Sequence, residues 1–95
     1  MTKFYLRMVV DMFYRFTSEL TIDKIEDSMI LKKATDNKIV CFDKHASMII
    51  QRLIEDGLEN TMKYCIERYE GVDIENDIIC FVAELVSKNY LVEYE

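Results

Sequence analysis

The feature that most constrains the fold is a change in the spacing of apolar residues near the middle of the chain. Residues 38–42 form a short β-branched and aromatic run after Asp36-Asn37, which is typical of a strand leaving a turn. From Ala46 onwards the apolar residues recur at helical spacing, and Asp43 is placed to cap the first turn. A strand therefore passes directly into a helix, so we expect a sheet with helices packed on it.

Chain length and hydrophobicity indicate one packed domain. The chain has 95 residues, of which 51% are hydrophobic, and this is near the size at which a single core suffices without metals or disulfides. No apolar run approaches the ~20 residues of a membrane span. The amino-terminal apolar run is broken by Asp11 and has no small-residue cleavage site. We therefore expect a soluble cytoplasmic protein without a secretory signal or a membrane partner.

Charge and cysteine content weigh against several functional classes. The net charge is −6, which disfavours a nucleic-acid partner because such binding depends on phosphate neutralisation. Cys41, Cys65 and Cys80 lie far apart among apolar residues, whereas zinc ligands usually come in closely spaced pairs. We expect no metal or cofactor, and buried thiols in a reducing compartment.

Before the change in spacing, the pattern predicts a three-stranded antiparallel meander. Residues 20–25 and 29–33 read as strands around a tight turn at 26–28, and a second polar turn precedes residues 38–42. A meander this small has one face that helices must cover. Its edges must be protected or used for binding.

After the change, apolar spacing predicts three helices. The first runs from about Lys44 to Glu55 and ends at Gly57, which suits a left-handed cap. The second spans the apolar positions between 58 and 69, and the third follows the N-cap Asp73 and ends before Asn89. Residues 90–94 can add a short terminal strand. The expected class is therefore α+β, of the winged helix-turn-helix type, with three strands followed by three helices.

The amino-terminal residues have two interpretations. Even positions from Phe4 to Phe16 are all apolar, which favours a strand, but Lys3, Arg7, Asp11 and Arg15 are four apart, which would make a polar stripe on a helix. The aromatic content favours an extended segment, and such an apolar arm could also mark a self-association surface. We assign residues 1–19 to this arm and residues 20–95 to the domain.

A family resemblance covers roughly residues 20 to 92. The pattern that carries it is Ile30-Leu31, then Ile39-Val40-Cys41-Phe42-Asp43-x-x-Ala46, a helix ending at Gly57, Ile66-x-x-Tyr69, and finally Asp77-Ile78-x-x-Phe81-Val82-x-x-Leu85-x-x-x-Asn89-Tyr90-Leu91. With this pattern the chain resembles the PqqD family, which comprises the peptide chaperone of pyrroloquinoline quinone biosynthesis and the related recognition elements of ribosomally synthesised, post-translationally modified peptide pathways. Phe42-Asp43 stands where the family commonly has Leu-Asn, and Asp43 can still cap a helix as Asn would.

The resemblance implies a binding module without catalytic activity. In the family, a leader peptide adds as a strand to the third strand and lies against the third helix. A modifying enzyme, for example a radical SAM enzyme or a leader peptidase, then receives the peptide. The protein itself would be a monomer or a weak dimer. The implied peptide-binding residues are Lys38, Ile39, Val40, Cys41, Phe42, Ile79, Val82 and Val86.

Other interpretations remain open from the sequence. The stripe of Ile79, Val82 and Val86 could complete a broad core face rather than line a peptide pocket. A winged-helix transcriptional regulator or a protein–protein adaptor would have the same order of elements. No catalytic motif is evident, and His45, the single histidine, belongs to no Cys or Ser nucleophile motif.

Overall fold

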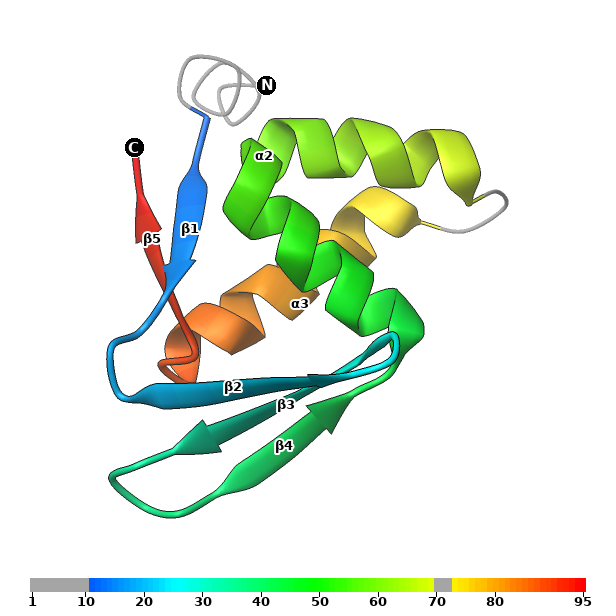
Figure 1. The fold of residues 1–95 in the computed structure, drawn as a ribbon. Coiled ribbons are helices and arrows are strands. Elements are labelled where there is room, and N and C mark those ends of the chain that lie inside the picture. Colours follow the sequence, from blue (N-terminus) through cyan, green and yellow to red (C-terminus); the bar gives the residue numbers. More distant parts are fainter. Residues whose placement is uncertain (1–10, 70–72) are drawn as a thin grey trace.

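A computed structural model describes residues 11–69 and 73–95 of the chain. Strands and helices follow one another in the order shown in Figure 1. The elements are β1 (Phe13–Phe16), β2 (Leu20–Ile25), β3 (Ser28–Lys33), β4 (Ile39–Phe42), α2 (Lys44–Arg68), α3 (Ile74–Ser87) and β5 (Leu91–Tyr94). The predicted α+β class, with an antiparallel three-stranded sheet and helices, is confirmed.

The meander is antiparallel and has the strand order β2-β3-β4. Its two turns contain residues with positive φ, Glu26 and Asn37, both at 57°. The second turn is closed by a hydrogen bond from the Lys33 N–H to the Lys38 carbonyl (3.0 Å), and the Asp36 carboxylate accepts from the Lys38 N–H (3.0 Å). Lys38 therefore belongs to this turn, and the strand begins one residue later than predicted.

A second, two-stranded sheet pairs the start of the described chain with its end. β1 and β5 are antiparallel, with Phe13 opposite Tyr94 and Phe16 opposite Leu91. Tyr14 is only 1% exposed and packs in the main core. Residues 13–16 are thus extended, as the aromatic content favoured. Residues 1–10 lie outside the described residues, and the division of the chain at residue 19 stays a prediction.

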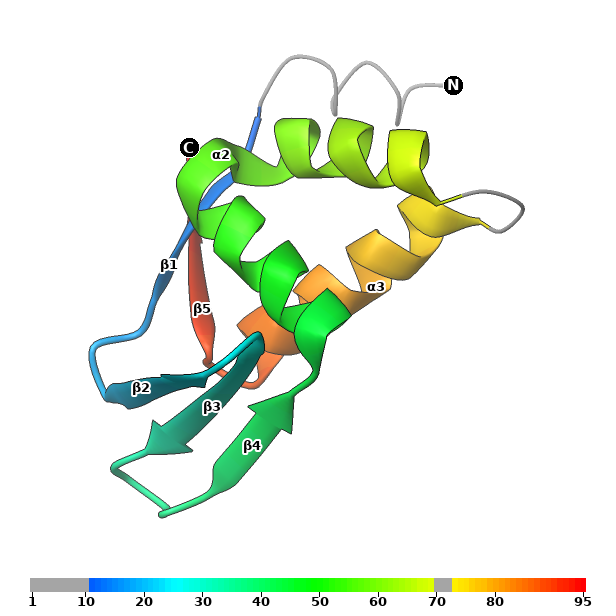
Figure 2. The same cartoon turned by 45° about the vertical axis from the view of Figure 1, so that its right-hand side comes forward.

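The described chain has two helices rather than the three that were predicted, because α2 continues through the position where a break was expected. Gly57 lies inside α2 with non-helical φ 85° and ψ 175°, and Figures 1 and 2 show α2 changing direction there. A Cβ at this position would lie 2.8 Å from two ring atoms of Phe13. Glycine therefore permits both the bend and the close approach of β1.

Both helices have the predicted N-caps. The Asp43 carboxylate accepts from the Ala46 N–H (2.9 Å), and the Asp73 carboxylate accepts from the Asn76 N–H (3.3 Å). After α3, Asn89 takes φ 63°, and the Tyr90 N–H donates to the Leu85 carbonyl (2.9 Å). Asparagine thus supplies the left-handed residue that turns the chain into β5.

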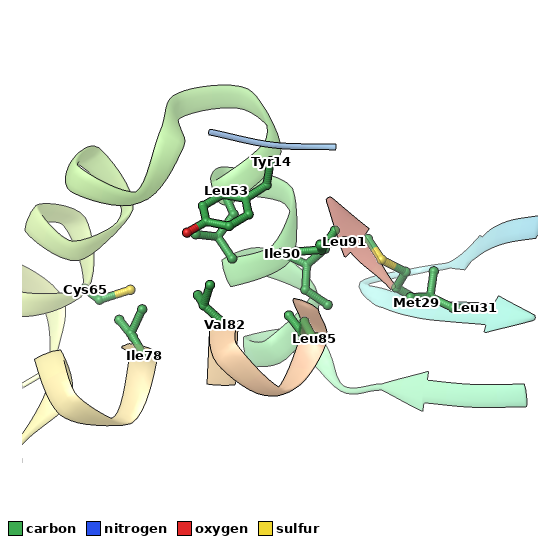
Figure 3. Packing of buried hydrophobic residues seen from close by; sticks show 10 residues of the cluster. All are labelled: Tyr14, Met29, Leu31, Ile50, Leu53, Cys65, Ile78, Val82, Leu85 and Leu91. Carbon is green, nitrogen blue, oxygen red and sulfur yellow. The ribbon is translucent and has the colours of Figure 1, made fainter. Parts of the chain in front are cut away.

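The core lies where the inner face of the meander, the two helices and the β1–β5 pair meet. Figure 3 shows its side chains converging from these elements. The buried hydrophobic residues are Tyr14, Met29, Leu31, Ile50, Leu53, Cys65, Ile78, Val82, Leu85 and Leu91. Within residues 11–69 and 73–95, no helix has the length and apolar character required to cross a membrane.

Candidate functional site

The outer edge of β4 is the feature most suited to binding a peptide. β4 pairs with β3 on one side only, and within the described chain no strand pairs with its other side. The extended amino-terminal segment, which could have covered this edge, has β1 paired with β5 instead. An edge strand of this kind presents unpaired backbone N–H and C=O groups.

The register identifies which residues present those groups. Lys33 and Lys38 form a hydrogen-bonded pair at the turn, and antiparallel pairs alternate between hydrogen-bonded and non-hydrogen-bonded types. The pairs Leu31–Val40 and Met29–Phe42 are then bonded within the sheet. The N–H and C=O groups of Ile39 and Cys41 therefore point outward from the β4 edge.

An aromatic contact places α3 beside the end of β4. The rings of Phe42 and Phe81 lie 6.1 Å apart between centroids at an interplanar angle of 81°, an edge-to-face arrangement. The side chain of Val40 lies opposite the buried Leu31, on the face of the sheet that packs against the helices. Ile39 is 61% exposed and lies on the other face. One face of α3 thus approaches the edge strand.

A hollow of about 350 Å³, which we call the strand-end hollow, lies between the two ends of α2 and the first half of α3. It is lined by His45, Ile49, Cys65, Tyr69, Ile74, Asp77, Ile78 and Phe81. The lining is mostly aliphatic and aromatic, and Phe81 connects it to β4. No residue of β4 lines the strand-end hollow itself, and the Phe42–Phe81 contact is its link to the end of β4.

The polar side chains that line the strand-end hollow include His45, Tyr69 and Cys65. The Nδ1 atom of His45 lies 3.1 Å from the Tyr69 hydroxyl, and the two rings meet edge to face at 6.0 Å. Burial raises the pKa of the Cys65 thiol, although the Arg52 guanidinium acts in the opposite direction. The sulfur is therefore a neutral thiol at neutral pH and packs as an apolar group. These features suit the binding of an apolar side chain.

The other predicted helix residues lie elsewhere. Ile79, Val82 and Val86 line a larger hollow of about 790 Å³ between the second half of α2 and α3, which we call the α2–α3 hollow. No residue of β4 lines it, and Val82 is only 5% exposed within the core. The structure therefore does not bring these three residues together with residues 38–42 in one groove.

The physical reason is the rotation of α3 about its axis. Ile78 and Leu85 are buried in the core, whereas Phe81 contacts Phe42, and Ile78 and Phe81 line the strand-end hollow. Sequence analysis did not single out Phe81, which contacts Phe42 at the end of β4, or Tyr69 and Asp77, which line the strand-end hollow. The helical spacing of Ile74, Ile78 and Phe81 was the available signal.

Comparison with solved structures places this arrangement among known folds. A structure described as lasso peptide synthetase B1 complexed with the leader peptide matches with a TM-score of 0.73 and 21% identity, covering 83% of this chain and 96% of that one. The chain has the same fold. A structure of TbiB1 in complex with the TbiA(β) leader peptide matches with a TM-score of 0.70 and 20% identity, covering 81% of this chain and 93% of that one.

These matches confirm the PqqD-like fold that the sequence motifs predicted. At about one-fifth identity they show the fold alone. No family model matches the sequence, and no curated protein matches it either. The predicted peptide contacts of residues 38–42 and of Ile79, Val82 and Val86 stay predictions.

Proposed function

We propose that this protein binds the leader segment of a ribosomally made precursor peptide as an added strand on β4 and presents it to a modifying enzyme. The observation that carries the proposal is the open edge of β4 with the apolar strand-end hollow at its end. Both solved structures of the same fold are described as complexes with a leader peptide. Their descriptions support, for this chain, a ligand of the same class.

Main-chain pairing alone is too weak for useful affinity. Ile39 and Cys41 offer four outward backbone groups on β4. At about 0.5–1.5 kcal/mol net per hydrogen bond they would contribute roughly 2–6 kcal/mol, whereas a micromolar complex requires about 8 kcal/mol. Burial of a peptide side chain in the strand-end hollow must supply the remainder, since a fully buried large apolar side chain contributes about 1.5–3 kcal/mol.

The proposed contacts therefore differ in part from the sequence prediction. Residues 38–42 remain the proposed pairing segment, with Ile39 and Cys41 as its hydrogen-bonding residues. Phe81 and Ile78 replace Ile79, Val82 and Val86 as the helix contribution, because they lie on the face of α3 that approaches β4. We also propose that the meander and the helices together form a winged-helix type of unit.

The proposal assigns the chemistry to a partner enzyme and recognition to this chain. As the PqqD resemblance implies, that enzyme would be a radical SAM enzyme or a leader peptidase. The expectation of buried thiols is wrong for Cys41 and Cys80, which are exposed, and holds for Cys65. Free thiols fit a reducing compartment such as the cytoplasm.

The test begins with finding the peptide. The full-length protein, immobilised and incubated with extract of its native cells, should retain a short precursor peptide that mass spectrometry identifies. A synthetic peptide of its leader, titrated into ¹⁵N-labelled protein, should shift the amides of residues 39–42 and of Phe81, and a scrambled peptide should not. Shifts confined to residues 58–66, or equal shifts with the scrambled peptide, would show that the proposed site is wrong.

A further inference from the structure

The α2–α3 hollow is not used by the proposed function, and it has a partly accessible apolar floor. The floor residues are Met12, Leu58, Met62, Ile66, Ile79 and Val86. Ile66 is 50% exposed, and the other five are half-buried. Apolar side chains that stay accessible together in one concave region are typical of an interaction site, whereas single scattered ones are not.

The rim of this hollow is strongly acidic. Its charged side chains are Asp11, Glu59, Glu75, Glu93 and Glu95, against the single cation Lys63. Lys63 lies 3.7 Å from the Glu59 carboxylate, and it is the only cation among the described residues that pairs with any of these acids. A ligand that fills the hollow would therefore gain from positive charges placed around an apolar surface.

The shape of the hollow indicates the kind of ligand. Its walls include the second half of α2 and one face of α3, with Met12 at one end, and Figure 2 shows the two helical segments close together at the end of α2 and diverging from there. A groove between two helices accepts a third amphipathic helix through apolar residues at positions i, i+3, i+4 and i+7. A volume of about 790 Å³ is large enough for several such side chains.

We propose that the α2–α3 hollow docks an amphipathic helix of a partner protein, with lysines or arginines flanking its apolar stripe. Ile79 and Val86 would contact the apolar stripe, and Glu59 and Glu75 would pair with the flanking cations. Ile78 and Phe81 line the strand-end hollow on another face of α3, and Phe81 contacts Phe42 of β4. The partner helix and a peptide on β4 could therefore be held at the same time, and this surface does not depend on the proposed leader binding.

The probe is a synthetic helix of about 18 residues, ~27 Å long, with leucines at the stripe positions and lysines between them. A matched helix carries glutamates in place of the lysines. The full-length protein should bind the lysine helix and not the glutamate helix. The double variant Glu59→Lys/Glu75→Lys should weaken binding about tenfold, and so should Ile66→Ser, because each removes one of the two contributions. Circular dichroism would verify that these surface variants remain folded.

The matched control is Glu26→Lys/Asp27→Lys in the exposed β2–β3 turn. It changes the net charge by the same amount and should leave the affinity for the lysine helix unchanged. Leader-peptide affinity should be the same in the Glu59→Lys/Glu75→Lys variant, so failure of one proposal is distinguishable from failure of the other.

Three results would overturn the proposal. Equal weakening in the turn control would show nonspecific charge attraction. Binding of the lysine helix only after residues 1–10 are removed would show that the chain covers its own hollow. A dimer in sedimentation that Ile66→Ser dissociates would make a second copy of this chain the occupant.

Discussion

Replacing Phe81 with alanine separates leader recognition from the stability of the fold. The Phe81 ring is half-buried, meets Phe42 edge to face, and forms one wall of the strand-end hollow. Its loss removes a wall against which a peptide side chain would pack, together with an aromatic pair that contributes about 0.5–1.5 kcal/mol beyond its buried area. We expect leader binding to weaken by about 1.5–2.5 kcal/mol, or roughly 10- to 70-fold in Kd.

The matched control is Ile79→Ala, two residues earlier and on the other face of α3. Ile79 is also half-buried, but it lines the α2–α3 hollow, away from β4. Its replacement should change the leader Kd by less than about threefold. Fluorescence anisotropy with a labelled leader peptide gives both affinities, and urea unfolding verifies that both variants stay folded. A large loss of leader affinity in Ile79→Ala, together with an unchanged leader affinity in Phe81→Ala, would refute the assignment of the α3 faces.

Three further predictions concern stability. Gly57→Ala should lower the free energy of unfolding in urea by about 1–3 kcal/mol, because φ is 85° and the new Cβ would lie 2.8 Å from the Phe13 ring; a neutral result would contradict the account of the bend. Val82→Asp should lower the free energy of unfolding by about 3 kcal/mol or more, because a carboxylate would enter a site that is 5% exposed. Urea denaturation should then begin at a lower urea concentration than in the unsubstituted protein. The raised pKa of the Cys65 thiol means that the folded state holds this proton more tightly than the unfolded state. Stability should therefore fall as the pH rises above about 9, and Cys65→Ala should flatten that slope in urea melts at pH 7 and pH 10; an unchanged slope would contradict this.

Several elements of the fold could be predicted because local chemistry determines them. Asp43 caps α2 next to the predicted change of spacing, and Asn89 takes the left-handed conformation expected after α3. Gly57 was correctly identified as a break in helical conformation, but the chain bends there and continues as helix. A single residue with positive φ can redirect a helix as well as end it, and the sequence does not distinguish the two outcomes.

The orientation of α3 could not be predicted because its apolar residues form a stripe wider than one packing face requires. Ile78, Ile79, Phe81, Val82 and Val86 cover too wide an arc for periodicity to select one face. Only packing against Phe42 and the rest of the core selects it. The prediction that this strand lies at the edge of the meander is confirmed for residues 39–42, whereas the peptide contacts of Ile79, Val82 and Val86 stay predictions.

The pairing of β1 with β5 could not be predicted from the sequence for a different reason. Phe13 and Tyr94 are opposite each other in the sheet but stand at opposite ends of the described chain. Short extended segments carry little information about distant partners, and register is determined by the tertiary fold. This pairing matters for function because it leaves the β4 edge open among the described residues.

Amide hydrogen exchange at β4 tests the central claim most directly. In the free protein the amides of Ile39 and Cys41 should exchange rapidly because they face the open edge, whereas those of Val40 and Phe42 should be protected by β3. Saturation with the leader peptide should then protect Ile39 and Cys41. If these two amides keep exchanging rapidly while the peptide is fully bound, the peptide does not add to this edge and the account is wrong.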